Sequence, residues 1–337
     1  GPDGVSCNFQ SVNRGKRSVV LNLKEPAAQA IVHRLVARAD VVIQSFLPET
    51  GMRLGIDYER LRAIRPDLVY CSISGYGEKG ELANKAGYDL MMQAFSGIMS
   101  TTGFEDGEPV RSGVSFIDLS TGLNAYGGIL TALLRRAGGG GGAAVRVSLL
   151  ETAISLLGYH AVSWLQAGVL PRREGSGVWH LVPYPAFRCR DGYILAGATN
   201  DAAWRRFCEV LGRQGVVDDP RFCTGEERLK HRAELVALIE EVLAGDTVTG
   251  WVARFDARGV AAAPLHTLNQ ALTHPQVLAN NMVVRVRNPQ GMELPLLGAS
   301  FKVSGHPGHA TKAAPQLGAD TVPVLRGEDR KSTRLNS

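Results

Sequence analysis

An acidic residue, Asp118, stands where a turn-rich loop meets a strongly amphipathic helical segment. The loop, residues 101–113, is rich in Gly, Thr and charged residues, whereas apolar side chains recur at helical spacing from Leu119 onward. A carboxylate at a helix N-terminus is favoured in its ionised form by the positive end of the helix dipole. The ionised form is also the one that attacks an acyl carbon. Asp118 therefore has two compatible interpretations, a helix N-cap and a nucleophile.

The cysteines indicate neither a metal site nor a redox site. The five are Cys7, Cys71, Cys189, Cys208 and Cys223, and they form no CxxC pair and no His/Cys cluster at metal-ligand spacing. We expect reduced thiols, no bound metal and a cytoplasmic location. No apolar run approaches the ~20 residues of a membrane span, so we expect no membrane association.

The charge pattern argues against nucleic acid as a partner. The formal net charge is +5, but Lys and Arg are spread along the chain and form no dense stripe with aromatic residues. The run of five glycines at 138–142 also lacks the GK[ST] and following helix of a phosphate loop. A strand pattern follows it at once, so it predicts a tight surface turn.

The elements that position Asp118 alternate between strand and helix. The sequence predicts strands at 18–23, 40–43, 68–73 and 144–149. It predicts helices at 27–39, 58–64, 89–99 and 151–165, besides the helix that runs on from Leu119. Strands separated by helices pair in parallel through crossover connections, so the predicted fold class is α/β.

The second half predicts a smaller domain. Residues 171–185 are crowded with Pro, Gly and Arg, which indicates a domain boundary. Beyond it we predict a hairpin from 184–189 and 192–196, helices at 201–211, 226–243 and 248–257, a strand at 259–265, and short strands within 282–303. We expect a large Rossmann-like domain with a parallel sheet from 1–168 and 286–328, and a small α/β domain from 169–285. The last residues, 329–337 (DRKSTRLNS), resemble a translated sequencing adapter, and we expect them to be an artefactual tail.

Five stretches of the sequence resemble family III CoA-transferases, which include formyl-CoA, carnitine and succinyl-CoA-dependent enzymes. They are NRGKRSVVLNLK (13–24), FLPETGMRLG (46–55), GYDLMMQAFSGIMSTTG (87–103), SGVSFIDLSTGL (112–123) and VSLLETA (147–153). They occur in the family's order, and the resemblance runs from residue 13 to about residue 307. It implies that Asp118 is the nucleophile and that Tyr88 and Asp89 form the tyrosine–acid pair beside it.

The resemblance implies a relay of covalent intermediates. Asp118 attacks an acyl-CoA to form a mixed anhydride, the released thiolate converts it to an aspartyl-CoA thioester, and an acceptor carboxylate then takes the CoA. Acyl-CoA and a small carboxylic acid are thus the expected partners, and no permanently bound cofactor is expected. Water must be excluded because either intermediate would hydrolyse.

The resemblance also implies where coenzyme A binds. The matching positions are Leu21, Asn22, Leu23, Lys24, Ser45, Phe46, Leu47, Arg53, Ala86 and Gly87. Lys24 and Arg53 are credible partners for its phosphates, and Phe46 for its adenine. Ser45 replaces a frequent asparagine, and Ala86 stands where formyl-CoA transferase has a basic residue, so we do not expect a formyl or oxalyl preference.

Two alternatives remain. An α-methylacyl-CoA racemase shares the fold, but related racemases have a histidine 30 residues before the aspartate, where this chain has Tyr88. Tyrosine, with an ordinary pKa of about 10, is a poor proton shuttle at neutral pH. The other alternative is an inactive CoA-binding homologue, because the family's opening βα unit is not found in this sequence and we expect weak activity or none. The resemblance also implies an interlocked homodimer.

Overall fold

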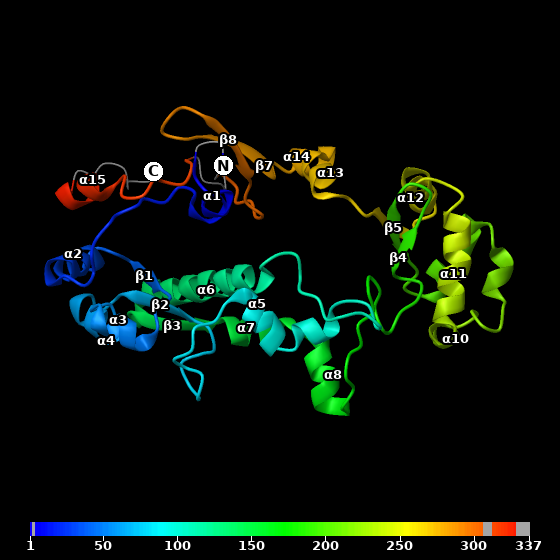
Figure 1. Cartoon of the computed structure of the whole chain (residues 1–337), viewed down its shortest axis with the longest axis horizontal. Helices are drawn as coiled ribbons and strands as arrows, with labels where there is room; N and C mark the ends of the chain where they lie inside the picture. The colour runs from blue at the N-terminus through cyan, green and yellow to red at the C-terminus, as the bar shows by residue number, and fades with distance from the viewer. Residues whose placement is uncertain (2–3, 306–311, 328–337) are drawn as a thin grey trace. The chain divides into compact units, whose positions relative to one another are not determined.

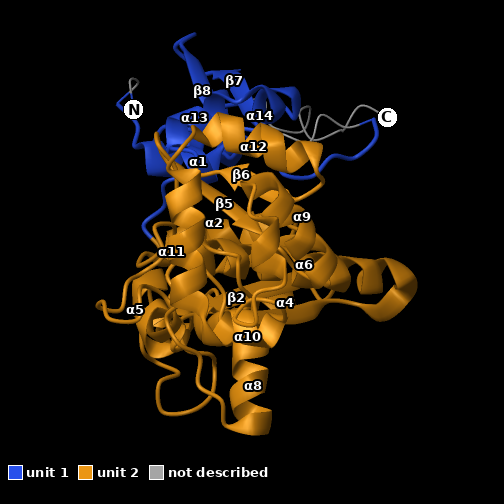
Figure 2. Cartoon of the chain, turned by 90° about the vertical axis from the view of Figure 1, so that its right-hand side faces the viewer, with its two compact units in different colours: residues 1–22, 266–337 blue, residues 23–265 orange. Residues whose placement is uncertain are grey.

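The structure is a computed structural model that describes residues 1, 4–305 and 312–327. Contacts divide the chain into two compact units: Gly1–Asn22 with His266–Ser337 form unit 1, and Leu23–Leu265 form unit 2 (Figure 2). These limits differ from the domain boundaries expected from the sequence, which stay a prediction. The expected tail, 329–337, lies outside the described residues.

A three-stranded parallel sheet lies in unit 2 (Figure 1). Its strands are β1 (Val41–Gln44), β2 (Val69–Ser74) and β3 (Ala143–Ser148), in the order β1-β2-β3. Each strand begins and ends within one residue of its predicted position. The predicted α/β fold with a parallel sheet is therefore confirmed.

The central strand β2 is buried on both faces, because successive side chains of a strand point to opposite sides. On one side Tyr70, with Leu68 just before the strand, packs with residues of α2 (Pro26–Val36) and α4 (Tyr58–Ile64). On the other side Val69 and Cys71 pack against α6 (Phe116–Arg135). Helices thus cover both faces of this sheet, as parallel strands require.

The direction of α6 decides where Asp118 lies. Just past its C-terminal end, the Arg136 guanidinium donates to the Asp67 carbonyl (3.1 Å) and to the Asp40 carboxylate (3.0 Å). Asp40 and Asp67 precede β1 and β2, so this end of α6 lies at the edge where the strands begin. The N-terminus of α6, with Asp118 on its first turn, therefore lies at the carboxyl edge, where ligands bind in open parallel sheets.

Glycines in left-handed conformations divide two of the predicted helices. The helix expected at 89–99 ends as α5 (Asp89–Phe95), and the short 3-10 helix η1 (Ile98–Thr101) follows Gly97, whose φ is 91°. The helix expected at 151–165 is two helices, α7 (Leu149–Leu156) and α8 (Tyr159–Ala167), separated by Gly158 with φ 51°. Glycine adopts such angles at little cost, whereas a helix does not continue through them. Helix α3 (Pro48–Arg53) follows β1.

Unit 2 also contains an antiparallel sheet. Strands β4 (Ala186–Arg188), β5 (Tyr193–Gly197) and β6 (Ala261–Pro264) form it, which confirms the predicted hairpin and the predicted later strand. Helices α9 (Asp201–Leu211), α10 (Gly225–Lys230), α11 (Arg232–Leu243) and α12 (Val248–Ala257) accompany it. The fully buried rings of Phe187, Trp204, Phe207 and Phe255 form the centre of this core. The helix predicted at 226–243 is divided at His231.

Unit 1 corrects one prediction. Its elements are α1 (Cys7–Asn13), α13 (Leu268–Thr273), α14 (Pro275–Ala279), the hairpin β7 (Val283–Arg287) and β8 (Glu293–Leu297), and α15 (Thr321–Arg326). The strand predicted at 18–23 is wrong. The backbone N–H groups of Ser18 and Val20 donate to the side chains of Asp320 (2.9 Å) and Thr321 (3.0 Å), where a strand would pair with a neighbouring backbone. Among the described residues, no helix is long and apolar enough to cross a membrane.

Candidate active site

Asp118 is the third residue of α6, and its side chain is exposed. Ser115 occupies the N-cap position, so the interpretation of Asp118 as the N-cap is wrong. The Ser115 side chain makes no capping hydrogen bond. Within the described part of the chain, no residue pairs with the Asp118 carboxylate. Its oxygens are therefore available to an incoming molecule.

Asp89 supplies the cap that Ser115 does not. Its side chain is buried, and Oδ2 accepts the backbone N–H of Ile117 (2.9 Å) and that of Asp118 (3.2 Å). Two of the N–H groups that a helix leaves unpaired at its start are thus bonded to a carboxylate from the start of α5. Since Asp89 takes these donors, they do not neutralise the charge of Asp118. The structure brings the two predicted acids together.

Two effects raise the pKa of the Asp118 carboxyl above its ordinary value. The larger is partial desolvation by surrounding atoms, and the smaller is the negative charge of Asp89. Both effects are moderate because water still reaches the exposed side chain. A carboxylate with a raised pKa is more basic, and so a stronger nucleophile, than an ordinary one.

Two glycines place Tyr88 at the same edge of the sheet. Gly75 directly follows β2, and a Cβ on it would lie 2.6 Å from the backbone N of Gly87. A Cβ on Gly87 would lie 2.9 Å from the Cα of Gly75, so only glycine permits this approach at either position. Tyr88 comes next, at the N-cap position of α5, with its side chain 73% exposed. Ala86 is also exposed.

Gln29 joins two of the predicted CoA-binding segments. Its Nε2 on α2 donates to the carbonyl of Leu23 (2.9 Å) and to that of Arg53 (3.5 Å). The predicted phosphate partners, Lys24 and Arg53, are therefore held near each other through one side chain. Sequence reasoning missed Gln29, and only its polarity on an otherwise apolar stretch of helix distinguishes it.

The segment after β1 borders a cavity of about 280 Å³ at the carboxyl ends of β1 and β2. Phe46 lines it together with Met52, Tyr58 and Tyr70, and the remaining wall contains both apolar residues and polar ones such as Glu78. Ser45 and Leu47 flank Phe46, and both are exposed. Leu21 and Asn22 belong to unit 1, and their part in this site stays a prediction.

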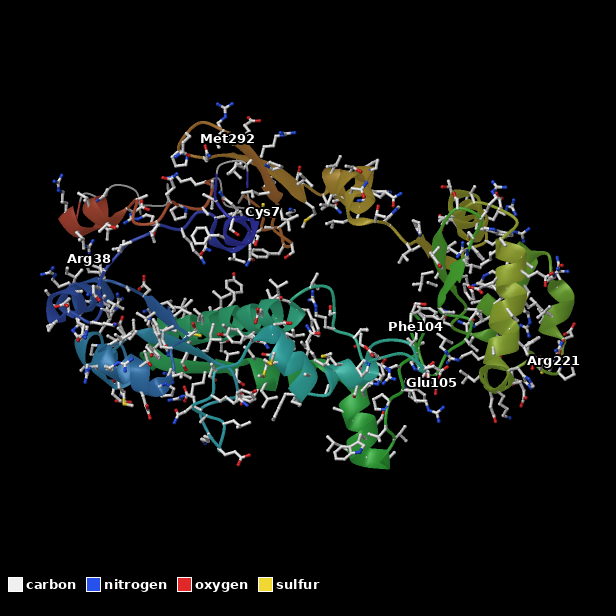
Figure 3. The ribbon with its side chains drawn as sticks, viewed as in Figure 1. Cys7, Arg38, Phe104, Glu105, Arg221 and Met292 are labelled. Atoms are coloured by element: carbon white, nitrogen blue, oxygen red, sulfur yellow. The ribbon has the colours of Figure 1, made fainter. Side chains whose placement is uncertain are left out.

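The loop that leads from η1 to Asp118 is tied down by one side chain. It carries Phe104 and Glu105 (Figure 3). The Arg173 guanidinium donates to the carbonyl oxygens of Phe104 (3.1 Å), Glu105 (2.8 Å) and Gly107 (2.8 Å). Three bonds to one planar cation fix the course of the backbone here.

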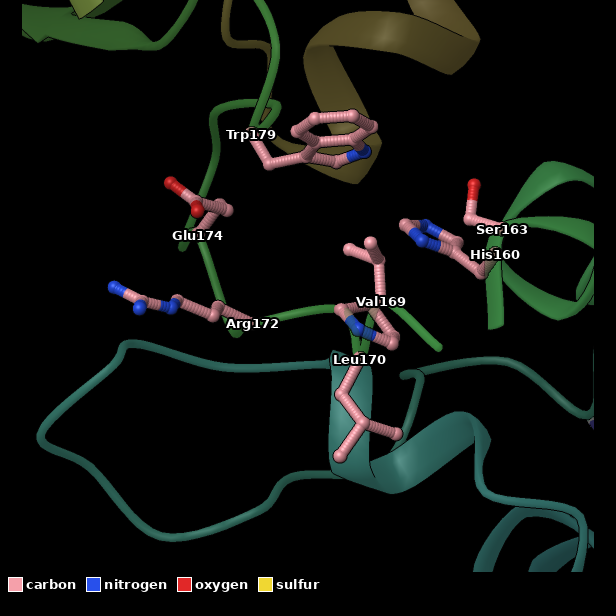
Figure 4. Close-up of a pocket in the computed structure, with 8 residues that line it drawn as sticks. His160, Ser163, Val169, Leu170, Arg172, Glu174 and Trp179 are labelled. Atoms are coloured by element: carbon pink, nitrogen blue, oxygen red, sulfur yellow. The ribbon is translucent and has the colours of Figure 1, made fainter. Parts of the chain in front are cut away.

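A separate cavity of about 250 Å³ lies between α8 and the segment that follows it. Figure 4 shows His160 and Ser163 on one side of it and Arg172 and Glu174 on the other. Arg172 pairs with Glu105 (3.5 Å), and Glu174 pairs with Arg232 (3.0 Å). Burial, and then the charge of His180, lower the pKa of His160, which favours its neutral form. The charged walls of this cavity are already paired, so it is a weaker candidate than the edge that carries Asp118.

The cysteines and acids do not form a metal site in the part of the chain that the structure describes, where no group of three or more suitable ligands occurs. All five cysteines are free. Burial raises the pKa of the Cys208 thiol to about 12 and that of Cys189 to about 11, so both remain protonated and unreactive at neutral pH.

Comparisons with known proteins give matches over nearly the whole chain. The model of CoA-transferase family III matches residues 1–321. The chain is 35% identical over 321 residues to the succinyl-CoA:glutarate CoA-transferase of Mus musculus, covering 95% of this chain and 74% of the relative. It is 36% identical over 314 residues to the acetyl-CoA:oxalate CoA-transferase of Acetobacter aceti, covering 93% and 79%. A crystal structure of a CAIB/BAIF family protein from Brucella suis superposes with a TM-score of 0.85 at 35% identity, covering 96% of this chain and 84% of that one.

The match over nearly the whole chain, together with the parallel sheet, defines the class of protein as a transferase of coenzyme A. The chain belongs to CoA-transferase family III. Enzymes of this class use CoA thioesters as substrates, which agrees with the predicted acyl-CoA partner.

Proposed function

We propose that the protein transfers coenzyme A from an acyl-CoA donor to a carboxylic acid acceptor through covalent intermediates on Asp118. The observation that carries the proposal is the unpaired carboxylate at the carboxyl edge of the sheet, beside a buried acid that occupies the helix-end donors. The relatives named above use succinyl-CoA with glutarate and acetyl-CoA with oxalate, so small mono- and dicarboxylic acids are the substrate class to test first.

The donor half of the reaction has two steps, and each step forms one bond and breaks one. A carboxylate oxygen of Asp118 attacks the thioester carbonyl, and the C–S bond breaks to release CoA thiolate and leave a mixed anhydride. The thiolate then attacks Cγ of Asp118 and expels the donor acid as its carboxylate. The enzyme now holds an aspartyl-CoA thioester.

The acceptor half reverses these steps with a different acid. The acceptor carboxylate attacks Cγ of the thioester, the thiolate leaves, and a second anhydride forms. The thiolate attacks the acceptor's acyl carbon and returns the carboxylate to Asp118. No proton is gained or lost overall, so the site needs no strong general acid or base.

The other predicted residues fit supporting roles. Each tetrahedral intermediate carries an oxyanion, and the exposed Tyr88 hydroxyl is suited to donate a hydrogen bond to it. Asp89 positions the first turn of α6. The segments held by Gln29 present Lys24 and Arg53 to the CoA phosphates, and Phe46 contacts the adenine.

We also propose that the active protein is a homodimer, as the family resemblance implies. Helix α8 leaves several large apolar side chains exposed, namely Tyr159, Val162, Trp164 and Leu165. Such a group on one short helix is typical of an interaction surface. Light scattering after size-exclusion chromatography tests this, and a monomer at micromolar concentration would contradict it.

The mechanism is tested by trapping. The protein is incubated with a panel of acyl-CoAs and acids, then treated with hydroxylamine or borohydride, and mass spectrometry locates the modified residue. We expect modification on Asp118 and none in the Asp118→Ala variant. Asp256→Asn, which changes an exposed aspartate on α12, is the control and should transfer CoA normally. Full exchange by Asp118→Ala would refute the mechanism, and CoA binding without exchange would support an inactive homologue.

A further inference from the structure

We infer that Gln93 is a positioning residue for the nucleophile, because it holds both the segment that leads to Asp118 and the acid that caps its helix. The inference rests on the proposed function, since it concerns the placement of Asp118 for attack. Gln93 does not touch a reacting atom. It acts through Asp89 and through the backbone of Ser112.

The side chain of Gln93 is completely buried and uses both ends of its amide. Its Nε2 donates to Oδ1 of Asp89 (2.5 Å), and its Oε1 accepts the backbone N–H of Ser112 (2.9 Å). The other carboxylate oxygen of Asp89 accepts the N–H groups of Ile117 and Asp118. A continuous chain of hydrogen bonds therefore runs from Ser112 to Asp118 through two side chains of α5.

This chain fixes the nucleophile's backbone from both directions. Asp89 and Gln93 are four residues apart on α5, so they lie on one face of that helix. Gln93 holds the start of the segment, at Ser112. Asp89 holds the end of the segment, at Ile117 and Asp118. The short turn between these two anchors is thus clamped to a single rigid element. Near-attack geometry requires such placement, and an error of about 1 Å costs roughly 100-fold in rate.

The position requires an amide in particular. A glutamine donates and accepts at once, whereas a glutamate only accepts when ionised. A glutamate at position 93 would still accept from Ser112, but it would face Asp89 with a second carboxylate. Two carboxylates in hydrogen-bond contact repel unless they share a proton. The added negative charge would raise the pKa of Asp118 further.

The pH dependence of Asp118 depends on the titratable groups of the elements that pack around it. Asp89 on α5 is the charge that acts on Asp118. Other titratable side chains on or beside the packed elements include Tyr76, Lys85, Tyr88, Arg111 and Glu151, and Tyr126 and Arg135 lie further along α6. Lys85 lies over the ring of Tyr76 (5.4 Å), and Glu151 on α7 accepts from Ser148 (2.6 Å). Arg111 donates to the Ser112 carbonyl (3.2 Å).

The test compares Gln93→Met, Gln93→Glu and the wild type in the full chain. Rates are measured with one acyl-CoA and one acid and divided by the fraction of chains in which Asp118 can be trapped. We expect Gln93→Met to lower kcat about 10- to 100-fold, with KM for acyl-CoA within about twofold. We expect Gln93→Glu to move the acidic limb of the pH–rate profile to higher pH, because added negative charge opposes ionisation of Asp118.

Gln10→Met is the matched control. Gln10 is also buried, and its Oε1 also accepts a backbone N–H, that of Ala314 (3.0 Å), but it belongs to unit 1, whereas Asp118 belongs to unit 2. The Gln10→Met variant should be less stable than the wild type. Its kcat, divided by the fraction of chains in which Asp118 can be trapped, should stay near the wild-type value. If both Gln93 variants keep kcat within twofold and the wild-type pH profile, the inference is overturned. If the wild type itself shows no trapping at Asp118, the proposed function fails instead.

Discussion

The Oδ2 atom of Asp89 lies 3.2 Å from the backbone nitrogen of Asp118 and accepts its N–H. Two acidic residues thus lie at the N-terminus of α6, and they have different roles. The buried Asp89 uses its charge to satisfy the helix, and the exposed Asp118 keeps a free carboxylate. The negative charge of Asp89 in turn makes Asp118 more basic. One contact therefore links the stability of α6 to the reactivity of its third residue.

Replacing Asp89 by asparagine separates these effects. The amide oxygen of Asp89→Asn still accepts one N–H, but it lacks the charge, so we expect a loss of about 1–2 kcal/mol in the free energy of unfolding. The pKa of Asp118 should fall because the like charge is gone, and the acidic limb of the pH–rate profile should move to lower pH. Urea unfolding and rates across pH measure both. If the acidic limb of the pH–rate profile moved to higher pH instead, the charge of Asp89 would not be what raises the pKa of Asp118.

Asp118→Asn should not destabilise the protein at neutral pH. The folded-state pKa of this carboxyl is raised, so its contribution to stability is fully present below the unfolded pKa and is lost as pH rises through the folded pKa. The ionised wild type therefore carries a small penalty at pH 7 that the amide removes. Because the side chain is exposed, we expect a gain of no more than about 0.5 kcal/mol. Thermal unfolding of the variant and the wild type at pH 7 and at pH 3 checks this expectation. The difference in stability between them should disappear at pH 3, where the carboxyl is protonated.

Strands and helices with strong periodicity could be predicted from the sequence. The strand at 68–73 is shifted by one residue, and α4, α9 and α12 begin and end where predicted. Their patterns are local, and the tertiary structure agrees with them. The strand expected at 18–23 failed because its β-branched pattern does not specify a partner, and the side chains of Asp320 and Thr321 satisfy its backbone.

The candidate site also contains features that the sequence predicts and features that it does not. The position of Asp118 at a helix start could be predicted because its motif is contiguous in sequence, whereas its role as nucleophile stays a prediction. Its capping by Asp89 was not predictable in detail, since the two residues are brought together only by the packing of α5 on α6. Gln29 and Gln93 were missed for a related reason: each bonds to a backbone group far along the chain, and the local sequence does not specify that partner.

Tyr88→Phe should separate catalysis from stability. The side chain is 73% exposed, so loss of its hydroxyl should leave the melting temperature unchanged. If the hydroxyl donates to the oxyanion, kcat should fall about 10- to 100-fold. This decrease is smaller than the one caused by removing the strongest oxyanion-hole donors. Tyr193→Phe, an exposed tyrosine on β5, serves as the control. A kcat within twofold of the wild type would remove Tyr88 from the mechanism.

Arg53→Gln should weaken acyl-CoA binding without slowing the chemical steps. A charge-assisted bond to phosphate contributes about 1.5–3 kcal/mol, so we expect KM for acyl-CoA to rise about 10-fold or more with kcat nearly constant. The same variant should show no such defect with an acyl-pantetheine, which lacks the phosphates. Arg205→Gln, on an exposed position of α9, controls for the change in net charge. An equal defect with both thioesters would rule out the phosphate contact.

The glycine run at 138–142 gives a matched pair of substitutions. The tight turn predicted here is in part a π-helical segment, Arg136–Gly140, and Gly142 follows it. A Cβ on Gly142 would lie 2.5 Å from the Leu68 carbonyl oxygen and 2.7 Å from that of Pro66, so the chain fits against the start of β2 only without a side chain here. Gly142→Ala should therefore destabilise the protein by about 2–3 kcal/mol. A Cβ on Gly138 meets nothing within 4 Å, and Gly138→Ala should be neutral or stabilising by about 0.5 kcal/mol. Both lie at the edge of the sheet opposite Asp118, so kcat of the folded enzyme should not change. Urea unfolding decides the matter, because equal stabilities of the two variants would mean that the close approach at Gly142 is not formed.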